Sequence, residues 1–345
     1  MLLVGELGHM VRRVVTLALA LTPALGSSAA QGTPAAPAEP VLALRLFGAP
    51  APPFALCPAA QVQPTCNIAS TSIAESETLE AIVARSRRPG IASVVLFLAG
   101  YSTSFVHGLA ETQHIAEQLG PRFLIVFVDW GSRGAHVDYE SDAHSARRNA
   151  PAFAALLSAL HTALPPDRQL AIFAHSMGTR VAVGAIAVVK AAPGEVVVNE
   201  AVLAAPDLSI DDYRKAITRK PQPFGRITIY ASHHDRALFL SAIIHLHRRL
   251  GQSLPGRMSL ADTDVVDASA ADRANEGHGY AIHDERVILD IGQTLLGAPT
   301  PHAAWKCVQG NLCVLDPSRV PDEVNATLPT SAAPAFRPTT SPPGP

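Results

Sequence analysis

A serine lies in a turn whose composition suits nucleophilic catalysis. The segment Ala174-His-Ser-Met-Gly178 follows a short apolar run, Leu170 to Phe173, and precedes a second one, Val181 to Val189. The first run predicts a buried strand and the second a helix packed against a core. A small residue two positions before and after Ser176 permits a sharp strand-to-helix turn that exposes the serine hydroxyl. The alternative is an ordinary turn in which Ser176 caps the helix.

Two later residues have the types that would activate this serine. A serine becomes an effective nucleophile when a base removes its proton and a third group orients that base. Asp235 follows a predicted strand, Arg226 to Tyr230, and His278 follows another, Asp264 to Asp267. Open parallel sheets place their sites at the carboxyl ends of strands, and hydrolases with this turn keep the order serine, acid, histidine. The sequence therefore predicts a catalytic triad of Ser176, Asp235 and His278.

Other residues compete for two of these roles. Asp207 follows the predicted strand Val196 to Ala204, where it is the rival acid or the cap of a helix that begins near Ile210. His283 is the rival base, at the start of the closing helix. The alternatives stay open at this point, with Asp235 and His278 favoured by their positions after strands.

The charge that develops on an attacked carbonyl oxygen needs two backbone donors. We expect the N–H of Met177 to be one, because it directly follows Ser176. The N–H of Tyr101 is our candidate for the other, in the loop after the predicted strand Val94 to Leu98. Gly100 would let this loop approach the serine closely.

Alternating strands and helices must position these residues. Such alternation predicts an α/β fold, with a mostly parallel central sheet and helices on both faces. Before this region we expect an edge strand over Val41 to Phe47 and a helix over Ser76 to Arg88. Besides the strands already given, the expected elements are a strand over Phe123 to Val128 and helices over Phe105 to Leu119, Glu140 to His161, Ala237 to Leu250 and Asp284 to Leu296.

The amino terminus resembles an export signal. Arg12 and Arg13 precede an apolar run from Val14 to Leu25 and a segment rich in Ser and Ala, so residues 1–30 read as a signal peptide. We therefore expect a secreted or periplasmic protein. This run is shorter than a membrane span, and no later stretch reaches about 18 apolar residues, which predicts no stable membrane insertion.

The four cysteines fit an oxidising compartment. Cys57 and Cys66 lie in one segment and Cys307 and Cys313 in another, which favours two local disulfides. A cross-tie between the two pairs is the alternative, and a zinc site is disfavoured because neither spacing is that of a C-x-x-C pair.

Composition divides the chain and limits its partners. The 345 residues carry a formal net charge of −2, which argues against nucleic acid or an anionic membrane surface as partner. We expect a signal peptide (1–30), an N-terminal extension with the Cys57/Cys66 loop (31–90), an α/β domain (91–297), a C-terminal loop with Cys307 and Cys313 (298–326) and a disordered Pro-rich tail (327–345).

Several motifs together resemble one bacterial family. The segment Leu96-Phe-Leu-Ala-Gly-Tyr-Ser-Thr-Ser-Phe105 is similar to one in the α/β-hydrolases filed as domain of unknown function 900. The resemblance implies the α/β-hydrolase fold, the triad of Ser176, Asp235 and His278, and ester hydrolysis. Two positions depart from the family, with Ala99 in place of His and Ser102 in place of Asn. Further matches are Tyr139, Asp142 and Ser145, Ala174 to Arg180, Leu203 to Asp207, Tyr230 to Leu238, Arg249 to Gly251 and Gly277 to Tyr280.

These observations predict a serine hydrolase, with a carboxylesterase favoured. Only about twenty residues separate the strands that end at Ala204 and start at Arg226, so the cap is short and small or medium acyl esters are the expected substrates. The triad chemistry needs no metal or organic cofactor. His233 and His234 beside Asp235 could suggest a metal site, but no other cluster of ligands is evident in the sequence, and solvated loop histidines are more common. The alternatives are an acyltransferase, thioesterase or amidase with the same triad, or a non-catalytic binding module.

Overall fold

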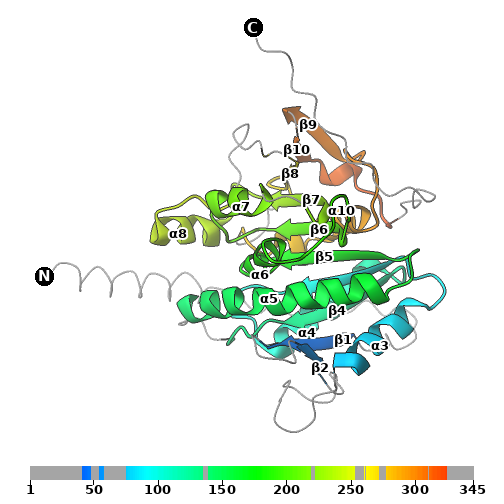
Figure 1. Cartoon of the computed structure of the whole chain (residues 1–345). Helices are drawn as coiled ribbons and strands as arrows, with labels where there is room; N and C mark the ends of the chain where they lie inside the picture. Colours follow the sequence, from blue (N-terminus) through cyan, green and yellow to red (C-terminus); the bar gives the residue numbers. More distant parts are fainter. Residues whose placement is uncertain are drawn as a thin grey trace, which may run out of the picture.

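A mostly parallel sheet forms the centre of the molecule. The computed structural model describes residues 41–47, 54–57, 75–134, 139–218, 222–252, 260, 262–271, 277–309 and 311–324. These residues form a ten-stranded sheet in the order β2-β1-β4-β3-β5-β6-β7-β8-β10-β9 (Figure 1). Neighbouring strands run parallel from β1 to β10, and only the outermost pairs, β1 with β2 and β10 with β9, are antiparallel. The α/β fold class is confirmed.

The central strands are buried on both faces, because their sequences are continuous apolar runs. Every residue of β3 and β4 is buried. The strands are β1 (Leu42–Leu46), β2 (Phe54–Leu56), β3 (Ser93–Leu98), β4 (Phe123–Asp129), β5 (Gln169–His175), β6 (Val198–Ala204), β7 (Phe224–Ala231), β8 (Asp264–Asp267), β9 (Trp305–Gln309) and β10 (Leu312–Leu315).

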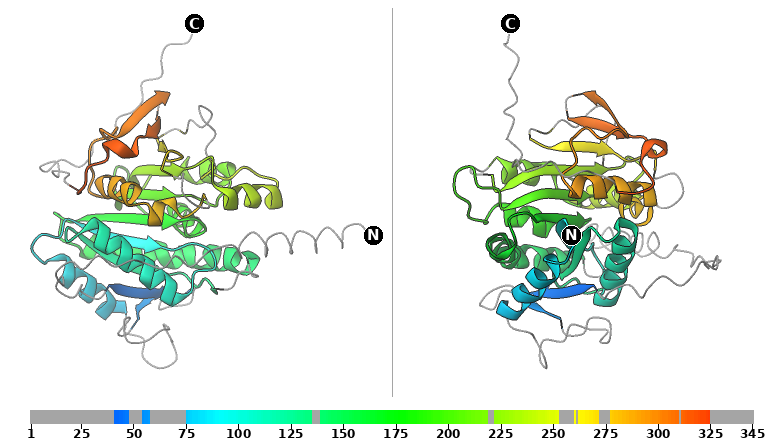
Figure 2. Two further views of the ribbon diagram at one scale, coloured as in Figure 1. Left: turned by 180° about the vertical axis from the view of Figure 1, so that it is seen from behind. Right: turned by 90° about the vertical axis from the view of Figure 1, so that its right-hand side faces the viewer.

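Helices cover both faces of the sheet, as the right-hand panel of Figure 2 shows. One apolar core includes residues of α3, α5 and α6, and a separate core on the other face includes residues of α4 and α10. The helices are α3 (Glu75–Ser86), α4 (Phe105–Leu119), α5 (Tyr139–Ala163), α6 (Gly178–Ile186), α7 (Ile210–Ile217), α8 (Arg236–His245), α9 (Tyr280–His283) and α10 (Glu285–Leu295), followed by a 3-10 turn over Pro317–Arg319.

Three sequence-based expectations about the elements are wrong. The strand at Leu42–Leu46 is not at the edge, because β2 pairs with its outer side. The segment expected to be a C-terminal loop (298–326) instead contains the hairpin of β9 and β10, which continues the sheet beyond β8. The helix α8 ends at His245 instead of Leu250, because Leu246 adopts a left-handed conformation with φ of 56°.

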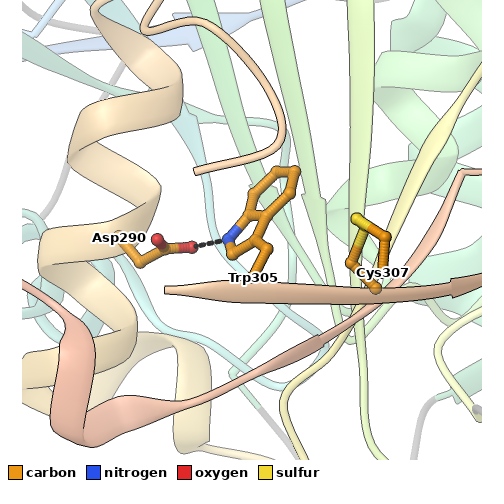
Figure 3. The surroundings of a disulfide bond; sticks show 4 residues. Asp290, Trp305 and Cys307 are labelled. Carbon is orange, nitrogen blue, oxygen red and sulfur yellow. Dashed lines mark hydrogen bonds between the residues drawn. A yellow bond between two sulfur atoms is a disulfide. The ribbon is translucent and has the colours of Figure 1, made fainter. Parts of the chain in front are cut away.

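Buried polar contacts attach the C-terminal hairpin to the body of the fold. The indole N–H of Trp305 on β9 donates a 2.7 Å hydrogen bond to Asp290 on α10 (Figure 3). The same carboxylate accepts from the Tyr230 hydroxyl at 2.7 Å and lies 2.9 Å from Nδ1 of His302. Because a buried carboxylate needs partners, this cluster fixes β9 against α10 and β7.

The cysteine pairing is local at the C-terminal hairpin. Cys307 and Cys313 form a disulfide that joins β9 to β10, so the predicted alternative of a cross-tie between the two pairs is wrong. Cys57 is also disulfide-bonded, while Cys66, the predicted signal peptide and the predicted tail (327–345) lie outside the described residues. No helix in the described part of the chain combines the length and apolar character that a membrane crossing requires.

Candidate active site

The turn at Ser176 joins β5 to α6 and is strained. Ser176 has φ of 50°, a left-handed conformation that residues with a side chain rarely adopt. A β-carbon on Gly178 would lie 2.5 Å from the carbonyl oxygens of both Leu98 and Ala99, so only glycine fits this position. The demand for a small residue two places after the serine is thereby confirmed, and its cause is the close approach of the loop after β3.

Backbone hydrogen bonds hold this strained turn in place. The N–H of Ser176 donates to the Ala204 carbonyl at 2.9 Å, at the end of β6. The Ser176 carbonyl accepts from the Thr179 hydroxyl at 2.5 Å and from the Asp207 N–H at 3.2 Å. These hydrogen bonds, from both sides of the turn, hold the backbone of Ser176 in its strained conformation. They use only its backbone groups, so its side chain stays available for other contacts.

The structure brings the three predicted side chains together from separate loops. Oγ of Ser176 lies 2.8 Å from Nε2 of His278, and Nδ1 of His278 lies 2.8 Å from Oδ2 of Asp235. The Asp235 side chain is fully buried, while a quarter of the His278 side chain is exposed. In the tautomer that satisfies both contacts, Nδ1–H donates to Asp235 and Nε2 accepts from the serine hydroxyl.

Asp235 has a second structural task. It is the N-cap of α8, where its Oδ1 accepts the N–H of Leu238 at 2.9 Å while Oδ2 faces His278. Burial raises the pKa of Asp235, and the adjacent His278 opposes that rise. Because the cap fixes one oxygen, the carboxylate that faces His278 has a single orientation.

A buried histidine supports the loop that carries His278. His175, the residue before the nucleophile candidate, lies with Nε2 3.1 Å from the carbonyl oxygen of His278. Burial lowers the pKa of His175 to about 3, which keeps its ring neutral. A neutral ring can donate from Nε2, so His175 acts here as a packing and hydrogen-bonding partner of the loop that carries His278.

The loop after β3 lies directly over the serine. A β-carbon on Gly100 would be 3.1 Å from Cβ of Ser176 and 3.6 Å from its Oγ. The indole N–H of Trp130 donates a 2.8 Å hydrogen bond to the Ala99 carbonyl and so fixes the start of this loop. Tyr101 follows Gly100 in the same loop, and the N–H groups of Tyr101 and Met177 remain our candidates for oxyanion donors.

Asp142 on α5 holds the far side of this loop, a role that the sequence analysis missed. Its fully buried carboxylate accepts from the N–H of Ser102 at 3.2 Å, the hydroxyl of Ser132 at 2.7 Å and the N–H of Arg133 at 3.0 Å. These bonds join the loops after β3 and β4. Asp142 was part of the family resemblance, but its contacts come from residues too distant in sequence to be paired by spacing.

The rival acid, Asp207, lies in a different cluster. Its Oδ1 is 3.2 Å from Nε of Arg249, and its Oδ2 is 3.5 Å from a guanidinium nitrogen of Arg180 and 2.5 Å from the Tyr139 hydroxyl. Burial alone would raise the pKa of Asp207, but the two arginines lower it below its usual value. Asp207 does not cap α7 either, because Ser209 accepts the N–H of Asp212 there.

The rival base His283 and the adjacent pair His233 and His234 do not take part in the contacts that link Ser176, His278 and Asp235. His283 ends α9, and its ring centroid is 6.4 Å from that of His114 on α4. His233 and His234 face each other at 4.0 Å between ring centroids. Across the described ranges, no group of three or more His, Cys, Asp or Glu side chains is arranged to hold a metal ion.

The fold and the loop geometry define an α/β hydrolase. Residues 74–294 match the family described as "Alpha/beta hydrolase of unknown function (DUF900)", and the chain belongs to this family. The predicted resemblance is confirmed. No curated protein matches the sequence.

Solved structures with a similar fold include two esterases and a peptidase. Esterase B from Lactobacillus rhamnosis, inhibited by a tributyrin phosphonate, is 13% identical with a TM-score of 0.37, over 61% of this chain and 77% of that one. Thermogutta terrifontis esterase 2 is 17% identical with a TM-score of 0.31, over 60% and 81%. A puromycin-hydrolyzing peptidase of Mycobacterium tuberculosis is 16% identical with a TM-score of 0.31, over 59% and 34%.

Proposed function

We propose that this protein is a carboxylesterase that cleaves small or medium acyl esters through an acyl-enzyme on Ser176. The observation that carries the proposal is the pair of 2.8 Å contacts that link Ser176, His278 and Asp235 in series. A hydroxyl, an imidazole and a buried carboxylate in this order are the groups that activated serine nucleophiles require.

In the first half of the reaction, Oγ of Ser176 attacks the ester carbonyl while Nε2 of His278 takes the hydroxyl proton. Asp235 accepts the Nδ1–H of His278 and stabilises the imidazolium that forms. The tetrahedral intermediate then collapses as His278 returns the proton to the departing alkoxide, which leaves as an alcohol. The acyl group is now bonded to Ser176.

The second half repeats these steps with water. His278 removes a proton from a water molecule, the resulting hydroxide attacks the acyl carbonyl, and Ser176 leaves with the proton that His278 returns. The carboxylic acid is the second product. In both halves we assign the oxyanion to the backbone N–H groups of Tyr101 and Met177, since backbone donors that are fixed in advance stabilise developing charge most effectively.

The connection between β6 and β7 supports substrates of limited size. The short helix α7 (Ile210–Ile217) is the element that the structure describes between these strands. A connection this short offers little material for a cap that would enclose a long acyl chain. We therefore expect turnover of p-nitrophenyl esters to fall as the acyl chain lengthens.

Export fits the same proposal. The disulfide between Cys307 and Cys313 favours an oxidising compartment, which supports our assignment of residues 1–30 as a signal peptide and the protein as secreted or periplasmic. Mass spectrometry of the protein released from cells would detect the cleaved amino terminus.

The test is the variant Ser176→Ala. We expect it to fold with the wild-type circular dichroism spectrum, to lose about a million-fold in kcat on p-nitrophenyl esters, and to resist labelling by a fluorophosphonate probe. Ser158→Ala, which alters a serine on α5 that bonds to Ala154, is the matched control and should label normally. Full labelling of Ser176→Ala would end the assignment, and trapping of the acyl group by added alcohols would indicate a transferase instead.

A further inference from the structure

The helix α8 exposes an unusually apolar surface. Its sequence, Arg-Ala-Leu-Phe-Leu-Ser-Ala-Ile-Ile-His, is apolar on nearly every side, yet only Leu238 and Ser241 are buried. On its outer side, Phe239 and Ile243 are 57% and 55% exposed. Helices that are apolar all round are normally enclosed by other elements, and within the described ranges no element covers this side of α8.

These exposed residues form one patch. Seven large hydrophobic residues are exposed in the described part of the chain. Four of them lie on α8 or at Leu246, the residue that ends this helix. Single exposed apolar residues are common and need no explanation, whereas a contiguous group marks a binding surface. We call this group the outer face of α8, and its members are Phe239, Ile243, Ile244 and Leu246.

Positive charge lies at both ends of the outer face. Arg236 is exposed at the start of α8, and His247 and Arg248 are exposed just after its end. From His233 to Leu250 the sequence has a single acidic residue, Asp235, and that carboxylate is buried against His278. The exposed ionic groups of this segment are therefore all basic.

The helices beside α8 do not reverse this local charge. Glu140, exposed at the start of α5, is an acidic group that interacts with His245, and it offsets one of the two exposed arginines. On α7 the acidic residues Asp211 and Asp212 each lie 3.9 Å from a basic partner one turn later, Arg214 and Lys215. The formal net charge of −2 argued against an anionic surface as partner, but net charge does not report how charges are distributed. Locally, an apolar strip with basic ends is complementary to an anionic, apolar partner.

The outer face is also close to the site in the fold. Figures 1 and 2 show α8 extending beyond the carboxyl end of β7, away from the body of the molecule. Its first turn is capped by Asp235, the carboxylate that contacts His278. A partner that binds the outer face of α8 would therefore lie next to the loop that carries Asp235.

We propose that the outer face of α8 docks the protein on an anionic phospholipid surface. The apolar side chains enter the boundary between head groups and acyl chains, and Arg236 and Arg248 lie against the phosphate groups. Binding in this plane grows with the apolar area that is buried and with the attraction of basic groups to anionic lipids, and the outer face of α8 with its two flanking arginines supplies both. If the proposed function is correct, the ester substrates come from this surface, and that consequence rests on the proposed function. The docking itself does not depend on it.

Vesicle co-sedimentation tests the docking without catalysis. The protein used is the processed form, without the predicted signal peptide (1–30), and it carries the substitution Ser176→Ala. It is mixed with vesicles of phosphatidylcholine plus phosphatidylglycerol, or of phosphatidylcholine alone. We expect stronger binding to the anionic vesicles, a loss of about tenfold or more in F239S/I243S, and a loss of about fivefold for each of R236Q and R248Q. Val308→Ser, which removes an equally exposed apolar residue on β9, should bind normally.

The results separate the two proposals. Equal binding of F239S/I243S and its parent, or no binding to anionic vesicles, would overturn the docking. A dimer in sedimentation velocity that F239S/I243S dissociates, together with absence of vesicle binding, would assign the outer face to a second copy and also overturn it. With wild-type Ser176, the same variants should keep wild-type kcat on a soluble ester, and vesicle binding without any esterase activity would reject the proposed function alone.

Discussion

Gly277 lies so close to His234 that a β-carbon at Gly277 would be 2.1 Å from the His234 carbonyl oxygen. Gly277 also has φ of 67°, a conformation that disfavours any residue with a side chain. The loop before α9 is therefore seated directly on the backbone of the loop after β7. This close packing brings His278 within 2.8 Å of Asp235, one residue beyond each contact point.

Replacing Gly277 by alanine should separate these two loops. We expect Gly277→Ala to lower kcat about a hundredfold or more, because small displacements of catalytic groups cost rates of this size. The control is Gly279→Ala, whose β-carbon would meet the ring of His283 at 2.7 Å, a side chain that can move. Steady-state kinetics and thermal melting of both variants provide the comparison, and wild-type kcat in Gly277→Ala would refute the importance of this packing.

The two oxygens of Asp235 allow its two roles to be tested separately. Asp235→Asn keeps a side-chain acceptor for the cap of α8 but removes the negative charge that selects the His278 tautomer. We expect it to lose about 10⁴-fold in kcat with little change in stability. Asp235→Ala should lose a similar amount of activity and in addition about 1 kcal/mol of stability, because the N–H of Leu238 loses its acceptor.

Kinetics and urea unfolding of both Asp235 variants distinguish the outcomes. Substantial activity in Asp235→Asn would point to another acid, with Asp207 as the candidate. Such a result would conflict with the position of Asp207 between Arg180 and Arg249, where its charge is already neutralised.

Most of the sheet could be predicted because its strands are continuous apolar runs. The strand over Asp264–Asp267 and the helix over Phe105–Leu119 have the bounds expected from sequence, the helix because Ser104 caps its start and Gly120 its end. The order of serine, acid and histidine predicted that three side chains would meet, and they do, although their catalytic roles stay predictions.

Elements whose stability comes from distant partners were missed. The strand Phe54–Leu56 is too short to give a pattern, and it pairs with β1. The hairpin of β9 and β10 has polar and cysteine residues among its apolar ones, and its anchor, Trp305 on Asp290, joins segments that no local pattern connects. The cluster of Asp207 with Arg180 and Arg249 is likewise formed only after folding.

Trp130 provides a test of the loop that carries the proposed oxyanion donor. Trp130→Phe keeps an aromatic ring but leaves the Ala99 carbonyl without the indole donor, which is 2.8 Å away in the structure. We expect about a tenfold loss in kcat with a matching loss in kcat/KM and little change in KM, because an interaction present in the transition state would be weakened. Tyr101 follows in the same loop.

The matched control for this variant is the other tryptophan. Trp305→Phe removes a buried indole hydrogen bond, to Asp290 at 2.7 Å, on β9, which lies at the edge of the sheet and is separated from β5 by four strands. Both variants should lose about 1–3 kcal/mol of stability, Trp130→Phe because the Ala99 carbonyl loses its indole donor and Trp305→Phe because the charged Asp290 loses one of its hydrogen bonds. Only Trp130→Phe should lose kcat. Equal kinetic losses in both variants would show that the effect of Trp130→Phe is one of general stability.

Glu111 on α4 should make stability depend on pH. Its Oε2 is buried without a hydrogen-bond partner, and burial raises the pKa of Glu111 from 4.5 to about 7. The folded protein therefore binds a proton more tightly than the unfolded chain between these values, so the free energy of unfolding falls as the pH rises from about 4.5 to about 7. Glu111→Gln removes this ionisation. We expect it to be more stable than wild type by roughly 1–3 kcal/mol at alkaline pH and nearly equal to it in acid.

Urea unfolding at both pH values measures the difference, with Glu117→Gln, an exposed position on the same helix, as the control for the loss of one charge. A stability gain that is the same at both pH values would show that the buried carboxylate is not the cause.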